Sequence, residues 1–214
     1  MGPAPDPITG ALLALRLLAV ADAPDVAERS GWPQPDIDRV LAHLDETGWA
    51  RYRPGRFPGW MLTGHGRAEG ERRLAQELDV TGARARTDVL YRRFLVLNPE
   101  VLRVASAWQV RTVGGVDVPN DHADEDHDAA VIAELEALHR RAEGLLAELE
   151  SPLPRLAGYR PRLSSALARV RSGEGDWFVR PGVDSYHTVW FELHEHLLVV
   201  LGIDGARFDD AVAV

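Results

Sequence analysis

The sequence has neither cysteine nor lysine. Without cysteine, disulfide bonds and thiolate zinc sites are excluded. All 24 basic residues are therefore arginine, which we attribute to GC-rich coding rather than to chemistry. The sequence also lacks an apolar run of about 18 residues, the length that a membrane-spanning helix needs. The longest early apolar stretch, residues 11–21, contains Arg16 and has no basic segment before it. We therefore expect a cytoplasmic protein with no signal peptide and no membrane contact.

The remaining composition is that of a folded globular protein. Hydrophobic residues make up 45% and charged residues 27% of 214 residues, a length that suits two small domains. The net charge of −9 argues against a protein whose whole surface binds nucleic acid. The charge is uneven, however, because residues 49–73 carry six arginines and two glutamates, whereas residues 121–150 carry ten acids and two arginines. A local basic surface can therefore exist in the first third of the chain.

The first 80 residues are predicted to form a helix-turn-helix followed by a β-hairpin. Thr9 is expected to cap a first helix, in which apolar residues recur at helical spacing. A short helix over residues 25–29 is expected to end at Gly31, and a longer one to start near Pro33 and end at Gly48. A short helix, a tight turn and a longer helix form the helix-turn-helix arrangement.

Strands are expected at residues 49–52 and 59–62, on either side of a turn rich in proline and glycine, with Thr63 capping the next helix. This run resembles the wing of MarR-type winged-helix regulators and the segment that follows it. The matching residues are Gly48, Trp49, Ala50, Arg51, Trp60, Met61, Leu62, Thr63, Gly66 and Arg67. The resemblance covers residues 8–78 and implies a winged helix-turn-helix that binds duplex DNA.

From Thr81 onward the pattern is helical and strand signals almost vanish. One helix is expected to stop at Asn98, with Pro99 opening the next, and residues 114–120 are expected to be a linker. A long helix over residues 128–150 carries apolar residues spaced alternately by four and three. These are Val131, Leu135, Leu138, Ala142, Leu145 and Leu149. Such a seam occurs both in antiparallel bundles and in dimeric coiled coils, so a homodimer stays an open alternative.

Two more helices are expected in the second half, one beginning at Pro161 and one covering residues 186–201. The predicted fold class is therefore mainly α. Residues 1–80 are expected to form a winged helix-turn-helix domain with a two-stranded wing. Residues 81–214 are expected to form an all-α helical bundle for ligand sensing, dimerisation or both.

The predicted DNA contacts lie on the third helix and the hairpin. A helix-turn-helix places its second helix in the major groove, and a wing contacts neighbouring phosphates. The candidates are Gln34, Arg39 and His43 on the helix and Arg51, Arg53 and Arg56 on the hairpin. The same helix carries Asp36, Asp38, Asp45 and Glu46, whose carboxylates repel phosphate. Two alternatives are open. The hairpin arginines can be part of a merely solvated turn, and the winged helix can bind protein instead of DNA.

Residues 120–128 combine several carboxylates with two histidines, which are residue types that bind metal ions. Their spacing is not that of an EF-hand, and an acidic cap on the long helix accounts for them. We therefore expect no metal. Asp121 and His122 are instead expected to reach a ligand pocket from the loop before the long helix.

The last predicted helix mixes histidines with aromatic residues. His187, Phe191 and His194 fall on one helical stripe. Because a buried imidazole needs hydrogen-bond partners, we predict a partly polar pocket here rather than plain packing. The full set of predicted ligand-binding residues is Trp108, Arg111, Asp121, His122, His187, Trp190 and His194. Core packing with hydrogen-bonded histidines is the alternative. Arg160 and Arg162 flank a helix start, which is a place to hold an anion, and the alternative for them is surface salt bridges to residues 121–150.

The second half also resembles a helical segment that occurs with winged helices in actinobacteria, in some proteins joined to domains like pyruvate phosphate dikinase. The matching residues are Leu97, Asn98, 108–111, 120–124 and 184–195. This resemblance implies a regulatory module for phosphoenolpyruvate or pyruvate metabolism.

No nucleophile elbow, phosphate-binding glycine loop or dinucleotide fingerprint occurs, so we expect neither an enzyme nor a cofactor. The predicted function is a bacterial transcriptional regulator that binds duplex DNA and responds to a small-molecule effector. The alternative is a winged helix that binds protein or regulates an enzyme without binding DNA.

Overall fold

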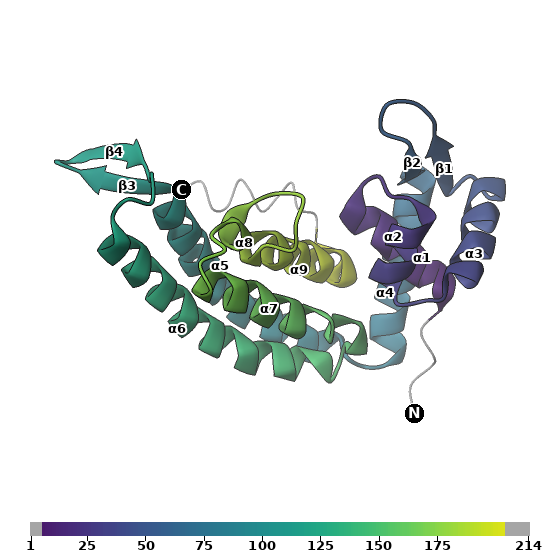
Figure 1. Cartoon of the computed structure of the whole chain (residues 1–214). Helices are drawn as coiled ribbons and strands as arrows, with labels where there is room; N and C mark the ends of the chain where they lie inside the picture. Colours follow the sequence, from purple (N-terminus) through teal and green to yellow (C-terminus); the bar gives the residue numbers. More distant parts are fainter. Residues whose placement is uncertain (1–5, 204–214) are drawn as a thin grey trace. The chain divides into compact units, whose positions relative to one another are not determined.

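The computed structural model describes residues 6–203 and divides them into two compact, mainly helical units (Figure 1). The first unit comprises residues 6–82 together with 195–203, and the second comprises residues 83–194. The sequence predicted a boundary two residues earlier and placed everything after it in one domain, whereas the end of the last helix groups with the first unit. None of the helices in the described part of the chain is long and apolar enough to cross a membrane.

The first unit contains the helices and the hairpin that the sequence predicted. Its helices are α1 (Pro7–Leu18), α2 (Ala23–Ser30), α3 (Gln34–Glu46) and α4 (Gly64–Val80). The cap of α1 was predicted wrongly, because Asp6 rather than Thr9 accepts the first free N–H groups, from Ile8 and Thr9. Pro7 has no N–H to donate and has a backbone angle suited to the first helical position, so the helix starts one turn earlier. Gly31 ends α2 with a left-handed backbone, as expected.

The hairpin of the first unit joins β1 (Ala50–Arg53) to β2 (Gly59–Leu62) in antiparallel register. Trp60 also exchanges two backbone hydrogen bonds with Ala21, of 2.7 and 3.1 Å, which attach the hairpin to the segment between α1 and α2. The apolar faces of α1, α2 and α3 meet in one core beneath the hairpin. Its fully buried members are Ala11, Leu12, Ala14, Leu15, Val26, Ile37, Leu41, Leu44 and Ala50.

The second unit is built on two long helices, α5 (Arg84–Gln109) and α6 (Glu125–Glu150), which pack along each other (Figure 1). Shorter elements complete it. They are the 3-10 turn η1 (Pro154–Leu156) and the helices α7 (Tyr159–Arg171), α8 (Asp176–Val179) and α9 (Tyr186–Leu201), of which α9 continues into the first unit. All six residues of the predicted apolar seam on α6 are buried. Because α5 and α7 pack on α6, the seam is used within this chain, as the bundle alternative required.

Two predictions for the second unit were wrong. The helix does not stop at Asn98, because α5 runs through Pro99 without a break. A proline inside a helix costs one hydrogen bond, and here burial of α5 residues on both sides, among them Leu97 and Val101, outweighs that loss. The expected linker is part of a second hairpin, β3 (Val110–Val113) and β4 (Val116–Pro119), so this half is not all helix. Gly114 and Gly115 form its turn, both with positive φ.

Candidate functional site

Three of the predicted DNA contacts lie together on the hairpin of the first unit. Arg51, Arg53 and Arg56 are all exposed. Arg51 and Arg53 are two residues apart on β1 and so lie on the same face of the strand. An Nη atom of Arg53 donates to the Phe57 carbonyl at 3.2 Å, and the Arg56 guanidinium lies 5.3 Å from the Phe57 ring. We call residues 50–62 the arginine hairpin.

The three candidates on α3 are also exposed, but their surroundings are acidic. Arg39 forms an ion pair with Asp36 and donates to the Pro35 carbonyl at 3.2 Å, so its charge is already partly neutralised. His43 packs its edge against Trp49, with ring centroids 5.9 Å apart. Gln34 lies at the start of the helix. The exposed acids of α3 are Asp38, Asp45 and Glu46, which leave this helix face with a negative balance.

The second unit contains a pocket of about 960 Å³. It lies between the end of α5, the start of α6 and the segment from the end of α7 through α8. Its lining residues are Trp108, Gln109, Asn120, His122, Asp128, Ile132, Val170, Gly173, Glu174, Gly175, Asp176, Trp177, Val179 and Arg180. Of the predicted ligand-binding residues, Trp108 and His122 line it. The volume is that of a site for a small organic molecule.

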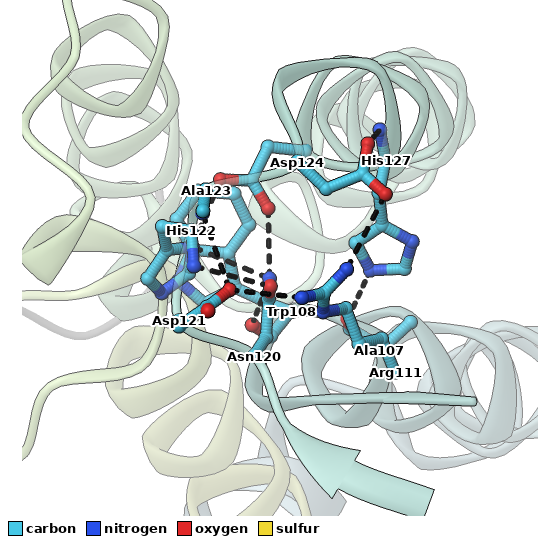
Figure 2. A network of polar contacts seen from close by, with 10 residues as sticks. Ala107, Trp108, Arg111, Asn120, Asp121, His122, Ala123, Asp124 and His127 are labelled. Carbon is cyan, nitrogen blue, oxygen red and sulfur yellow. Dashed lines mark hydrogen bonds and ion pairs between the residues drawn. The ribbon is translucent and has the colours of Figure 1, made fainter. Parts of the chain in front are cut away.

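His122 is held in one orientation by three neighbours (Figure 2). Its ring lies on Trp108, with centroids 4.5 Å apart, and its Nδ1 lies 2.9 Å from a carboxylate oxygen of Asp128. Its backbone N–H donates to the side chain of Asn120 at 3.2 Å. The backbone of His122 is left-handed, with φ of 58°, which costs energy in a residue other than glycine. The surrounding contacts keep the residue in this conformation.

Asn120 connects the parts of this arrangement. Its side-chain amide donates to the Trp108 carbonyl at 3.1 Å and to Asp128 at 2.7 Å. Because a carboxylate can only accept and the Asn120 amide nitrogen, 3.3 Å from Nδ1, already donates to Trp108 and Asp128, the 2.9 Å contact with Asp128 favours the tautomer of His122 with its proton on Nδ1. No described residue contacts Nε2 of His122 through a hydrogen bond, so this atom is available to a ligand. Asp128 was not predicted as a site residue; only its place in an acidic stretch pointed to it.

Arg111 and Asp121 lie beside this pocket and do not line it (Figure 2). Arg111 donates to Asp121 at 3.1 Å and to Asp124 at 3.4 Å. The N–H of Ala123, together with the Arg111 charge, holds the pKa of Asp121 below its ordinary value. These residues therefore fix the loop that carries His122. Their predicted role as ligand contacts is not supported by this geometry.

The three predicted ligand residues of α9 do not line the pocket. Trp190 is buried against Phe94, with ring centroids 4.7 Å apart, and its indole N–H donates to Asn98 at 2.9 Å. His194 lies 3.2 Å from the Tyr91 hydroxyl. His187 is half-buried, and burial lowers the pKa of its imidazole. The prediction that α9 and the loop at His122 share one pocket is wrong, because no α9 residue lines this pocket and Trp190 and His194 pack on Phe94 of α5.

Phe191, which the predicted stripe placed between the two histidines, is 57% exposed. Arg160 and Arg162 are held by carboxylates, Arg160 by Glu150 at 2.8 Å and Arg162 by Asp184 at 2.7 Å. The salt-bridge alternative therefore describes Arg160, whereas the partners of the partly buried Arg162 lie outside residues 121–150. Among the residues that the structure describes, no cluster of three or more histidines and carboxylates has the arrangement of a metal site.

A scan against models of known families, a search of curated proteins and a search of solved structures found no match to this chain. We therefore infer function from the arginine hairpin and from the pocket at His122.

Proposed function

We propose that the protein is a transcriptional regulator, in which the first unit is a winged helix that binds duplex DNA and the second unit senses a small molecule. The observation that carries the DNA-binding part is the arginine hairpin, where three exposed arginines lie within six residues, next to a three-helix core. In a winged helix the hairpin is the wing, which lies along the phosphate backbone of DNA.

The charge distribution assigns different roles to the hairpin and to α3. Arg51 and Arg53 share a face of β1 and carry no paired carboxylate among the described residues, so they can approach two phosphates. The face of α3 has more acids than bases, and its one arginine is paired with Asp36. We therefore expect the hairpin to supply most of the affinity through phosphate contacts, and Gln34 and His43 to supply base contacts.

The pocket at His122 supports the sensing part of the proposal. It combines a volume suited to a small molecule with an imidazole whose orientation is fixed by Asp128. The apolar seam of α6, which left a dimeric coiled coil open, gives no support to a homodimer, because α5 and α7 cover α6 within the chain.

The test is binding of the purified protein to genomic fragments and then to a selected duplex over a range of salt concentrations. Arg51→Ala and Arg53→Ala should each weaken binding by a similar factor for all sequences and lower the salt slope by about one unit. Arg103→Ala is the matched control, because Arg103 is equally exposed but lies on α5 in an ion pair with Glu134. Unchanged slopes in both hairpin variants would contradict the wing assignment.

A second function, a winged helix that binds a protein, is favoured by the acidic face of α3. Asp38, Asp45 and Glu46 are exposed on this helix and none has a described basic partner. Such a face suits a basic protein surface better than phosphates. If no fragment is enriched at low salt and Asp38→Asn abolishes capture of a basic partner, this second function replaces the first.

A further inference from the structure

We propose that the pocket at His122 binds a small organic cation, an amine with N–H donors. This inference deepens the sensing role proposed above and rests on it. The pocket lining contains three carboxylates, from Asp128, Glu174 and Asp176, and one guanidinium, from Arg180. A ligand that carries positive charge is therefore favoured by the field of the pocket, and one that carries negative charge is opposed.

The single arginine of the lining does not offset this preference. Arg180 donates to Asp176 at 2.6 Å, so these two charges neutralise each other. Glu174 is partly engaged, by Arg169 at 3.4 Å and by the Ser172 hydroxyl at 3.3 Å. Asp128 lies deeper, with 16% of its side chain exposed, and no arginine pairs with it. The charge that remains is that of Asp128, the one carboxylate of the lining without an arginine partner among the described residues.

The hydrogen-bonding groups of the lining are mainly acceptors. The Nδ1–H group of His122 donates a hydrogen bond to Asp128, so Nε2 presents a lone pair when the ring is neutral. The amide nitrogen of Gln109 is within 3.4 Å of the Ala105 carbonyl, which leaves its amide oxygen as the group for a ligand. Each carboxylate oxygen can accept more bonds than it receives here. A ligand that fits must bring donors, as a protonated amine or a guanidine does.

The aromatic residues of the pocket suit a cation as well. Trp177 lines the pocket and already holds the Arg169 guanidinium 3.9 Å from its ring centroid. Trp108 is stacked on Phe178, with ring centroids 4.7 Å apart, and contacts the tilted ring of His122 at 4.5 Å, so it forms a fixed wall rather than a movable surface. The volume of about 960 Å³ exceeds the need of a lone metal ion or ammonium ion and suits an amine with a carbon chain.

The test is calorimetric titration of the full-length protein, without DNA, with agmatine and spermidine as cations and with inorganic phosphate and citrate as anions. Saturable binding of at least one cation and none of either anion is expected. Asp128→Asn should weaken cation binding at least about tenfold, because it removes the buried charge and the partner of His122. His122→Asn, which keeps a residue type that tolerates a left-handed backbone, should also weaken it.

Asp126→Asn is the matched control, because Asp126 is exposed on α6, two residues before Asp128, and does not line the pocket. Its affinity should equal that of the unchanged protein. If Asp128→Asn unfolds, Glu174→Gln at the exposed rim replaces it and should weaken the cation several-fold.

Two results would overturn the proposal. One is absence of binding by both amines up to about 1 mM. The other is binding of phosphate or citrate that is lost in Arg180→Gln, which would make the pocket an anion site. Because DNA is absent from this titration, the regulator proposal is judged separately. Cation binding without any DNA binding would leave this inference standing and remove the transcriptional role.

Discussion

At the scale of single residues, Gly66 lies directly against the backbone of Trp49 and has no room for a side chain. A Cβ atom at this position would lie 1.8 Å from the Trp49 carbonyl oxygen, and the Gly66 N–H donates to the capping hydroxyl of Thr63 at 3.1 Å. Gly66→Ala must therefore move the start of α4 away from β1. We expect a loss of about 3 kcal/mol or more in the free energy of unfolding, measured by urea titration.

Gly64→Ala is the control for this prediction. It is two residues earlier in the same turn of α4, and a Cβ there would meet nothing within 4 Å. Its stability should stay unchanged or rise slightly, since alanine favours helix more than glycine does. Equal stability of the two variants would show that the Trp49 carbonyl and α4 do not approach this closely.

Single residues also show how far the candidate site followed from the sequence. Trp108 and His122 were predicted as ligand residues from their chemistry, and both line the pocket. Asp128 was interpreted only as part of a helix cap, because its bond to His122 depends on the left-handed turn at His122, which no sequence pattern predicts. The prediction that His194 lines the pocket rests on the hydrogen-bond partners that a buried imidazole needs. Tyr91 supplies a hydroxyl 3.2 Å away, from a helix about 100 residues distant in the chain.

At the scale of elements, Arg162 joins α7 to the start of α9. It donates to Asp184 at 2.7 Å and to Glu192 at 2.9 Å, and Tyr159 also donates to Glu192 at 3.1 Å. Burial by itself would lower the pKa of Arg162, but the hydrogen bonds to both carboxylates more than offset this and raise it. Arg162→Met removes the Arg162 cation from the buried Glu192, and we expect a loss of roughly 2–4 kcal/mol in the free energy of unfolding of the second unit.

The control is Arg93→Met. Arg93 forms an equally short ion pair, at 2.7 Å to Glu148, but both partners are about half exposed. Its loss should change the unfolding midpoint much less, because water solvates the carboxylate that remains. Similar midpoints for the two variants would mean that Arg162 contributes no more than a surface pair.

The elements of the first unit could be predicted because each has a local signal at its end, such as the glycine that ends α2 or the threonine that caps α4. Two elements of the second unit could not. Pro99 carries a strong local signal for a helix break, and only the packing of α5 on α6 overrides it. The hairpin β3–β4 has strands as short as those of β1–β2 but none of their residues is buried, and its two glycines suit a linker as well as a turn.

At the scale of the whole molecule, two half-buried or buried histidines make stability depend on pH. Burial lowers the pKa of His139, although the Glu143 carboxylate partly opposes this, and burial also lowers the pKa of His187. The unfolded chain therefore takes up these protons first, near the ordinary value of 6.5. Stability is full above this pH and falls as the pH drops below it.

Unfolding by urea at about pH 7.5 and about pH 5 measures this effect. His139→Gln, which retains a polar side chain beside Tyr186 and Ser164, should reduce the loss of stability between the two pH values. His43→Gln is the control, because His43 is exposed and its change should leave the pH dependence as it was. A pH dependence that His139→Gln and His187→Gln both leave intact would place its origin in other groups.

The hairpin β3–β4 is closed at its base, where the Asn120 N–H donates to the Gln109 carbonyl at 2.8 Å. The end of α5 and the residues that approach α6 are thus joined by a hydrogen bond as well as by the chain. The turn of the hairpin at Gly114 and Gly115 is exposed and does not set the distance between α5 and α6. For protein engineering, this tip is the point where the polypeptide can be opened to new termini, or a fluorescent reporter inserted, with the walls of the pocket left in place.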